Sequence, residues 1–246
     1  AAMNHETPDR VPVMCQLALG HYFIHGSEKP SDIWFDSGIF AATLIAFQQR
    51  YGFDGLLLNL PGRPTEWRDY LSAYQQTDKR EELKWRCGLE TWIPPDDNAQ
   101  TFAAGEQPLA RSDYQHVDPD DPATFRTSGY VWNTWHAPSL WDIDADADLA
   151  DPAAYPQWLT RPLRIARQAV PDVSVHVEVF SPFTHLMELF GYEQALMALI
   201  DAPALCHVLL ERCTRHAAAE ARCQAAWLPD AVLISSAFAG GGFIGR

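Results

Sequence analysis

The chain is poor in cationic side chains and has no long apolar run. Its 18 Lys and Arg residues stand against 32 Asp and Glu residues, so the formal net charge of the 246 residues is −14. Nucleic acids and anionic membrane surfaces both require clustered Lys and Arg, so this composition disfavours either partner. No apolar run reaches the roughly 18 residues of a membrane span. The polar first ten residues lack the apolar core of a signal peptide.

Cysteine is also scarce, and its spacing matches no common metal motif. The five cysteines form no Cys-x-x-Cys or Cys-x-His pair, which favours a reducing, cytoplasmic setting over a disulfide scaffold. Cys206, His207, Cys213, His216 and Cys223 follow the spacing of one long helix. One helix cannot wrap such residues around a tetrahedral ion, so we expect buried cysteines and no metal there.

Aromatic residues are abundant, with nine Trp, eight Tyr and twelve Phe. Many lie in the middle of the chain beside Pro, Asp and Gly. They predict a loop-rich, aromatic-packed insertion over about 80–155; an aromatic-lined pocket is the alternative. Within it, the acidic run Trp141–Asp148 suggests calcium. An EF-hand loop would need a central Gly and a distant Glu, so a solvated acidic loop is expected instead.

The rest of the chain alternates between strand and helix patterns. Strands are predicted at 11–17, 55–60, 173–180 and 231–236, helices at 38–50, 156–169, 192–200 and about 203–225, and a hairpin at 83–95. Short, uniformly apolar strands alternating with helices indicate an α/β fold with a parallel sheet covered by helices. We therefore expect a single α/β domain over 1–246.

Residues 173–180 alternate strictly between two faces. One face carries four valines and the other carries Ser174, His176, Glu178 and Phe180. Valines facing outward and polar groups facing inward fit a barrel whose interior holds a site; an antiparallel strand with one wet face is the alternative.

In α/β barrels the site is built at the carboxyl ends of the strands. Glu178 is the sharpest candidate there, as a general acid or base or a ligand anchor, with a structural ion pair as the alternative. His176 is better explained as a core histidine. His185 either faces the site or belongs to the next helix, which Ser181 or Thr184 would cap.

Four segments resemble the uroporphyrinogen decarboxylase superfamily. They are Thr7–Val13 running into Leu19–Tyr22, Tyr51–Gly55, Phe180–Tyr192 followed by Asp201–Pro203, and Pro229–Ser236 with Ala239 and Gly240. The resemblance implies a (β/α)8 barrel of the TIM type, here with an inserted hairpin. Only four strands are predicted, so we expect the N-terminal part of such a barrel.

The departures from the family disfavour porphyrinogen decarboxylation, and the inserted hairpin with Glu90–Asp97 looks more like the cobalamin-dependent methyltransferase and demethylase branch. True decarboxylases hold substrate carboxylates with two arginines of a Met-Arg-Gln-Ala-Gly-Arg-Tyr motif. Leu17 and His21 occupy those positions here, and leucine cannot replace a bidentate guanidinium. The branch uses zinc held by a His-x-Cys pair and a later Cys, and this chain has no His-x-Cys. Zinc and a corrinoid are thus implied by resemblance alone.

Three functions follow as hypotheses. The first is methyl transfer or demethylation of a small substrate with a corrinoid protein as partner; the second is decarboxylation of a polycarboxylate, with Arg63 as a clamp; the third is a non-catalytic, ligand-binding half barrel. A homodimer is also possible. The expected catalytic residues are Glu178 and His21, and the expected substrate contacts are Tyr22, Asn59, Arg63, Ser181, His185 and Ser236.

Overall fold

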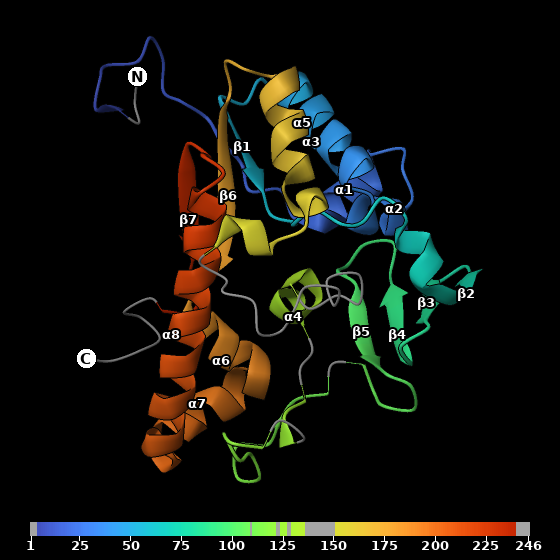
Figure 1. Cartoon of the computed structure of the whole chain (residues 1–246), viewed down its shortest axis with the longest axis vertical. Coiled ribbons are helices and arrows are strands. Elements are labelled where there is room, and N and C mark those ends of the chain that lie inside the picture. Colours follow the sequence, from blue (N-terminus) through green and yellow to red (C-terminus); the bar gives the residue numbers. More distant parts are fainter. Residues whose placement is uncertain (1–3, 109, 122–123, 127–128, 136–150, 240–246) are drawn as a thin grey trace.

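The computed structural model describes residues 4–108, 110–121, 124–126, 129–135 and 151–239. They form a mixed α/β structure with two separate sheets (Figure 1). One sheet has three parallel strands in the order β1-β6-β7, and the other has four antiparallel strands in the order β2-β3-β4-β5. The predicted α/β fold with parallel strands is confirmed. The described ranges contain no closed barrel.

The elements have the following bounds. The strands are β1 (Gly55–Leu58), β2 (Leu71–Gln76), β3 (Glu81–Trp85), β4 (Leu89–Ile93), β5 (Gln100–Ala103), β6 (Ser174–Phe180) and β7 (Ala231–Ser235). The α-helices are α1 (Leu19–His25), α2 (Pro30–Phe35), α3 (Ser37–Tyr51), α4 (Tyr130–Trp135), α5 (Arg161–Ala169), α6 (Pro182–Phe190), α7 (Tyr192–Asp201) and α8 (Pro203–Ala225). Short 3-10 turns are η2 (Trp67–Tyr70), η5 (Pro152–Ala154) and η6 (Gln157–Thr160).

The parallel sheet adds its strands in chain order. Residues 174–177 of β6 pair with β1, and residues 176–180 pair with β7. The strand predicted at 11–17 is wrong in extent, because this segment contributes a single parallel bridge from Met14 to Gly55. Val11, Val13 and Met14 are exposed, so the apolar run is not buried by helices as a full strand would be.

Local signals in the sequence set the helix ends. The Asp36 carboxylate accepts hydrogen bonds from the amides of Gly38 and Ile39 at 2.8 and 3.0 Å and starts α3. Gly52, with φ +70°, ends it in the left-handed region. The Ser181 hydroxyl accepts from the Thr184 amide at 3.1 Å, which confirms Ser181 as the cap of α6.

The antiparallel sheet is larger than the predicted hairpin. β3 and β4 pair as expected around Gly88, whose φ is +88°, but the sheet begins at Leu71, before the expected insertion boundary. Its buried side chains join the main core, and the rings of Phe35 and Trp85 lie 5.1 Å apart. The parallel sheet and its helices share that core, so the two sheets pack as parts of one structure.

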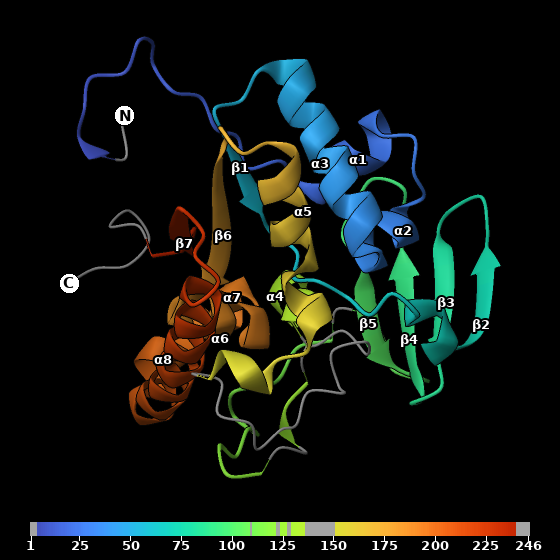
Figure 2. The ribbon, with the colours of Figure 1, turned by 45° about the horizontal axis from the view of Figure 1, so that its top comes forward.

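Figures 1 and 2 show the two sheets on opposite sides of the molecule, with α3 and α5 beside the parallel sheet. Both faces of β6 are buried from Val175 to Phe180, which excludes the antiparallel strand with one wet face. A second core cluster lies among α6, α7 and α8. The predicted helix at 192–200 corresponds to α7.

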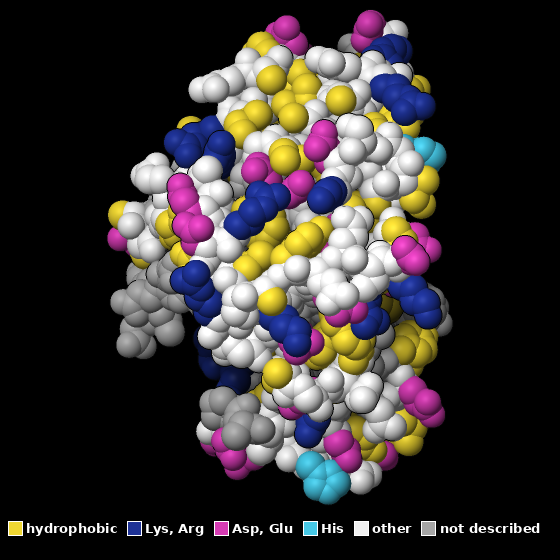
Figure 3. Space-filling model, turned by 90° about the vertical axis from the view of Figure 1, so that its right-hand side faces the viewer, with side chains coloured by type: hydrophobic (Ala, Val, Ile, Leu, Met, Phe, Trp, Pro, Cys, Tyr) yellow, Lys and Arg dark blue, Asp and Glu magenta, His cyan; other side chains and the backbone are white. Residues whose placement is uncertain are grey.

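On the face drawn in Figure 3, Lys and Arg side chains are interspersed with Asp and Glu. The acidic run 141–148 lies outside the described residues, so the structure tests neither calcium binding nor a solvated loop there. Among the described helices, no single one is long and apolar enough to cross a membrane. α7 and α8 meet that criterion as a pair, but they are bent by 119° at their junction.

The shared core predicts that the antiparallel sheet contributes to global stability. Ile93 on β4 is fully buried, whereas Ile200 on α7 is 77% exposed. Ile93→Ala is expected to lower the free energy of unfolding by about 2–5 kcal/mol through lost burial and a cavity. The control Ile200→Ala is expected to change it by less than about 0.5 kcal/mol. Urea unfolding of both variants tests this; equal small effects would show that the sheet packs loosely.

Candidate functional site

Polar side chains gather at the carboxyl-terminal edge of the parallel sheet. Asn59 follows β1, Glu178 lies two residues before the end of β6, and Ser236 follows β7. Gln16 lies two residues after the Met14 bridge. Parallel strands end at the same edge, so residues far apart in the sequence converge there.

Glu178 is buried at this edge without a cationic partner. Its side chain is 4% exposed and forms no ion pair with any described residue. The amide of Gln16 donates to Glu178 Oε1 at 2.8 Å, whereas Oε2 is buried and has no hydrogen-bond partner among the residues of the described chain. Burial raises the pKa of Glu178, and the Ser235 hydroxyl and the Gln16 amide lower it only in part. The carboxyl group is therefore biased toward its protonated form.

Asn59 and Tyr130 complete the surroundings of Glu178. Asn59 Nδ2 donates to the Leu17 carbonyl at 3.3 Å, while Asn59 Oδ1 is buried with no partner. The Tyr130 hydroxyl donates to the Asn59 carbonyl at 3.1 Å, and its ring meets Phe180 edge-on at 5.4 Å. Burial first, and the Glu178 carboxylate second, raise the pKa of Tyr130. Two buried acceptors at the ends of the neighbouring strands β1 and β6 thus lack a hydrogen-bond partner among the described residues, an arrangement that suits a ligand with donors to offer.

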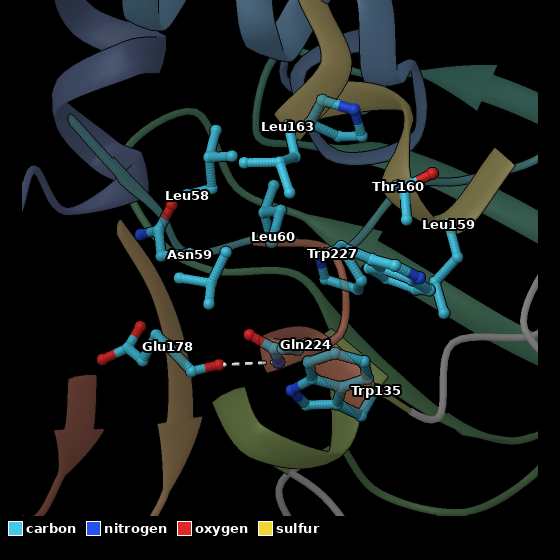
Figure 4. Close-up of a pocket in the computed structure, with 13 residues that line it drawn as sticks. Leu58, Asn59, Leu60, Trp135, Leu159, Thr160, Leu163, Glu178, Gln224 and Trp227 are labelled. Atoms are coloured by element: carbon cyan, nitrogen blue, oxygen red, sulfur yellow. Dashed lines mark hydrogen bonds between the residues drawn. The ribbon is translucent and has the colours of Figure 1, made fainter. Parts of the chain in front are cut away.

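An apolar cavity lies at the same edge, and we name it the apolar slot. It is lined by Leu58, Asn59, Leu60, Pro61, Trp135, Leu159, Thr160, Pro162, Leu163, Val177, Glu178, Gln224 and Trp227. Figure 4 shows the Glu178 carboxylate directed away from Trp135 and Trp227, while Gln224 Nε2 donates to the Glu178 backbone carbonyl at 3.0 Å. Glu178 thus lines the slot, but its carboxylate is turned away from these two tryptophans.

Three hydroxyl groups join the ends of β6 and β7. Ser236 Oγ donates to Ser181 Oγ at 2.9 Å, and Ser181 Oγ lies 3.0 Å from Thr184 Oγ1. The Ser181 amide also donates to the Ser235 carbonyl at 2.8 Å. The structure thus brings the predicted contacts Ser181 and Ser236 together, in positions that fix the start of α6.

His185 faces α8. Its ring lies 5.8 Å from the ring of His216, and His216 forms an ion pair with the buried Glu220 at 2.8 Å. Burial lowers the pKa of His185 to about 4. Burial also lowers the pKa of His216, but Glu220 overrides it and the net shift is upward. His185 is therefore a neutral core histidine whose Nε2 has no hydrogen-bond partner in the described chain.

The two candidates in the N-terminal part of the chain, His21 and Tyr22, pack between helices. His21 Nε2 lies 3.1 Å from the Tyr51 hydroxyl, at the end of α3 that precedes β1, and its ring packs against Phe47. This position is at the opposite end of β1 from Asn59, so the structure does not bring His21 to Glu178. Tyr22 is 1% exposed, stacks on Phe40 at 5.7 Å, and has a pKa raised by burial.

Arg63 is fully buried beside α4. Its Nη2 donates to the carbonyls of Thr134 at 2.6 Å and Asn133 at 3.3 Å, which belong to the end of that helix. Burial lowers the pKa of Arg63 to about 9, so it remains charged at neutral pH. Its Nε and Nη1 have no partner in the described chain. Arg63 is not among the residues that line the apolar slot.

The described residues contain no group of three His, Cys, Asp or Glu side chains placed to hold a metal ion. Cys206 and Cys223 are buried, as expected for the apolar stripe of α8. The zinc implied by the family resemblance therefore does not fit this part of the chain.

Sequence reasoning missed several residues of this edge. Gln16 lies in the segment predicted to end the first strand, so its position there was a usable signal. Tyr130, Trp135 and Trp227 gave no local signal beyond the general abundance of aromatic residues. Gln224 was not singled out, because its segment predicts only the last turns of the long helix α8.

The depressed pKa of His185 predicts acid sensitivity. The ordinary pKa of histidine is 6.5 and that of the folded state is about 4, so the unfolded chain takes up the proton first. The stabilising contribution is complete above pH 6.5 and is lost as the pH falls toward 4. Between pH 7 and pH 4 the wild type should lose up to about 3 kcal/mol more unfolding free energy than His185→Gln. Equal losses in urea titrations at the two pH values would contradict this assignment.

Comparison with known proteins places no constraint on identity, since no family model, no curated protein and no solved structure matches the chain. The family resemblance of the four segments stays a prediction.

Proposed function

We propose that this protein removes or transfers the methyl group of a small methylated substrate, with Glu178 as the proton donor to the leaving atom. The supporting observation is a buried carboxyl group with one unpartnered oxygen at the carboxyl edge of a parallel sheet. The proposal also includes the barrel architecture that the family resemblance implies.

The order of the parallel strands supports the barrel. The bridge at Met14, then β1, β6 and β7, are neighbours in the same order as in the chain. An α/β barrel adds its strands in this way, whereas a doubly wound sheet reverses direction at a switch point. The side chains of Asn59 and Glu178 would then face the mouth of the barrel, where such enzymes hold their substrates.

The state of Glu178 suits demethylation. When a methyl group leaves an oxygen, nitrogen or sulfur atom, the bonding electron pair stays on that atom, which needs a proton to become a stable product. A carboxyl group that keeps its proton to a higher pH than an ordinary glutamate can supply it. The Asn59 Oδ1 atom offers an acceptor to orient a donor group of the substrate. The amide of Gln16, an exposed residue, is the group that the substrate would displace from Glu178.

A corrinoid protein is the methyl acceptor that the family resemblance implies. The described residues do not single out a surface or a set of side chains for a corrin ring, so we assign them only to substrate binding and to proton transfer. Zinc is the other implied group. The described residues contain no set of ligands for it, and the proposed step does not use it.

Decarboxylation of a carboxylate substrate is the second candidate. Arg63 favours it, because two of its buried nitrogens lack partners in the described chain and a guanidinium binds carboxylates well. However, Arg63 is also held by the carbonyls of Asn133 and Thr134 at the end of α4. We therefore place this function after methyl transfer.

Glu178→Gln tests the proton donor. Assays would follow methylcobalamin formation from cob(I)alamin and a panel of methoxy, methylthio and methylamino compounds, together with release of carbon dioxide from polycarboxylates. The variant is expected to lose at least about 100-fold in methyl transfer, the usual contribution of a general acid. Glu193→Gln, at an exposed position on α7, is the matched control and should keep full activity. Absence of methyl transfer by the wild type on the whole panel would refute the proposal.

The pH profile provides an independent check. Since burial raises the pKa of Glu178, the acid form persists to higher pH than for an ordinary glutamate. Methyl transfer should therefore stay constant at low pH and decline as the pH rises through this raised pKa. A rate that instead increases with pH over this range would assign Glu178 the role of a base.

A further inference from the structure

A second hollow opens beside the apolar slot, along α5 and the turn before it. We name it the α5 groove; it is lined by Ala153, Tyr155, Pro156, Gln157, Thr160, Leu163, Arg164, Arg167, Gln168 and Trp227. Thr160, Leu163 and Trp227 line both the groove and the slot. The two hollows therefore meet at Trp227. The slot, with a cavity volume of about 40 Å³, is too small for an aromatic ring, whereas the groove, with about 600 Å³, can hold one.

The wall between the slot and the α5 groove is apolar and aromatic. Figure 4 shows Trp135 and Trp227 near Leu159 and Thr160 at one end of the slot. Tyr155 meets Trp227 edge-on at 6.0 Å on the groove side. Flat aromatic walls with aliphatic neighbours favour a planar, apolar ligand body.

The outer part of the groove is cationic in a protein of strongly negative net charge. The groove lining contains two arginines and no Asp or Glu. Arg167 is already paired with Asp230 at 2.9 Å. Arg164 is exposed, and within the described chain its guanidinium forms one hydrogen bond, from Nη2 to the Gln157 carbonyl at 2.8 Å. Most of its donors thus remain available to an anion.

The start of α5 adds to this positive potential. Thr160 occupies the cap position, but its hydroxyl donates to the Gln157 carbonyl at 3.2 Å, so no side chain caps the helix. The first turn of α5 holds no acidic residue. The Arg161 amide already donates to the Trp158 carbonyl and Pro162 has no amide hydrogen, so this end contributes its helix dipole and not free amides. Thr160 and Leu163 place it where the slot and the groove meet.

We propose that the α5 groove binds an aromatic anion, with the ring against Tyr155 and Trp227 and its carboxylate at Arg164. This site is separate from the proposed methyl transfer, because Glu178 is not among the residues that line the groove.

Calorimetry with indole-3-acetate and indole-3-acetamide tests the proposal, since the two differ in charge but hardly in shape. The wild type should bind the acetate about tenfold more tightly than the amide, and Arg164→Gln should remove most of this difference while leaving amide binding unchanged. Arg86→Gln is the matched control, because Arg86 is also exposed and also donates to a backbone carbonyl, that of Leu71 at 3.3 Å. It should bind like the wild type.

Glu178→Gln separates this site from the proposed catalytic one. The variant should bind indole-3-acetate as the wild type does, even if methyl transfer is lost or never found. Equal affinity for acetate and amide, no binding of either at millimolar concentration, or loss of acetate binding in Glu178→Gln would each overturn the proposal.

Discussion

A carboxyl group buried in the middle strand of a parallel sheet is the constraint on which this structure depends. Glu178 has strands on both sides and has no cation among its described neighbours. A charged carboxylate in such a place would lose its hydration without an ion pair in return. The upward shift of the Glu178 pKa follows from this conflict, and it also suits the group to the proposed role of an acid. Burial of the Glu178 carboxyl group is thus the common cause of its energetic cost to the fold and of its raised pKa.

The elements around Glu178 explain how this arrangement is held. Ser181 fixes the start of α6 directly after β6, and Gln224 at the end of α8 holds the Glu178 backbone carbonyl. Tyr130 on α4 bonds the Asn59 carbonyl, so α4 covers the edge where β1 ends. Most of these contacts use backbone carbonyls. The carboxyl group itself has the exposed Gln16 side chain and the Ser235 hydroxyl as its described donors, and Gln16 leaves room for exchange with a substrate.

Much of the parallel part was predictable, because its signals are local. The alternation in 173–180 predicted β6 and placed Glu178 near its carboxyl end, and Ser181 followed from cap chemistry. The strand at 11–17 was overpredicted, since an apolar run does not reveal whether helices will cover it. Tyr130, Trp135 and Trp227 reach the edge from the insertion and from the turn after α8. Their placement depends on long-range packing, which periodicity does not encode. The same holds for the extra strands β2 and β5.

The central claim is that Glu178 keeps its proton at a higher pH than an ordinary glutamate. Carbon-13 NMR of the protein labelled at glutamate side-chain carboxyl groups, with Glu178→Gln to assign the resonance, measures this directly. The account predicts a Glu178 titration midpoint clearly above the ordinary value of 4.5. A midpoint at or below 4.5 would show a stably charged carboxylate, and it would contradict both the proposed acid role and the physical reason given for it.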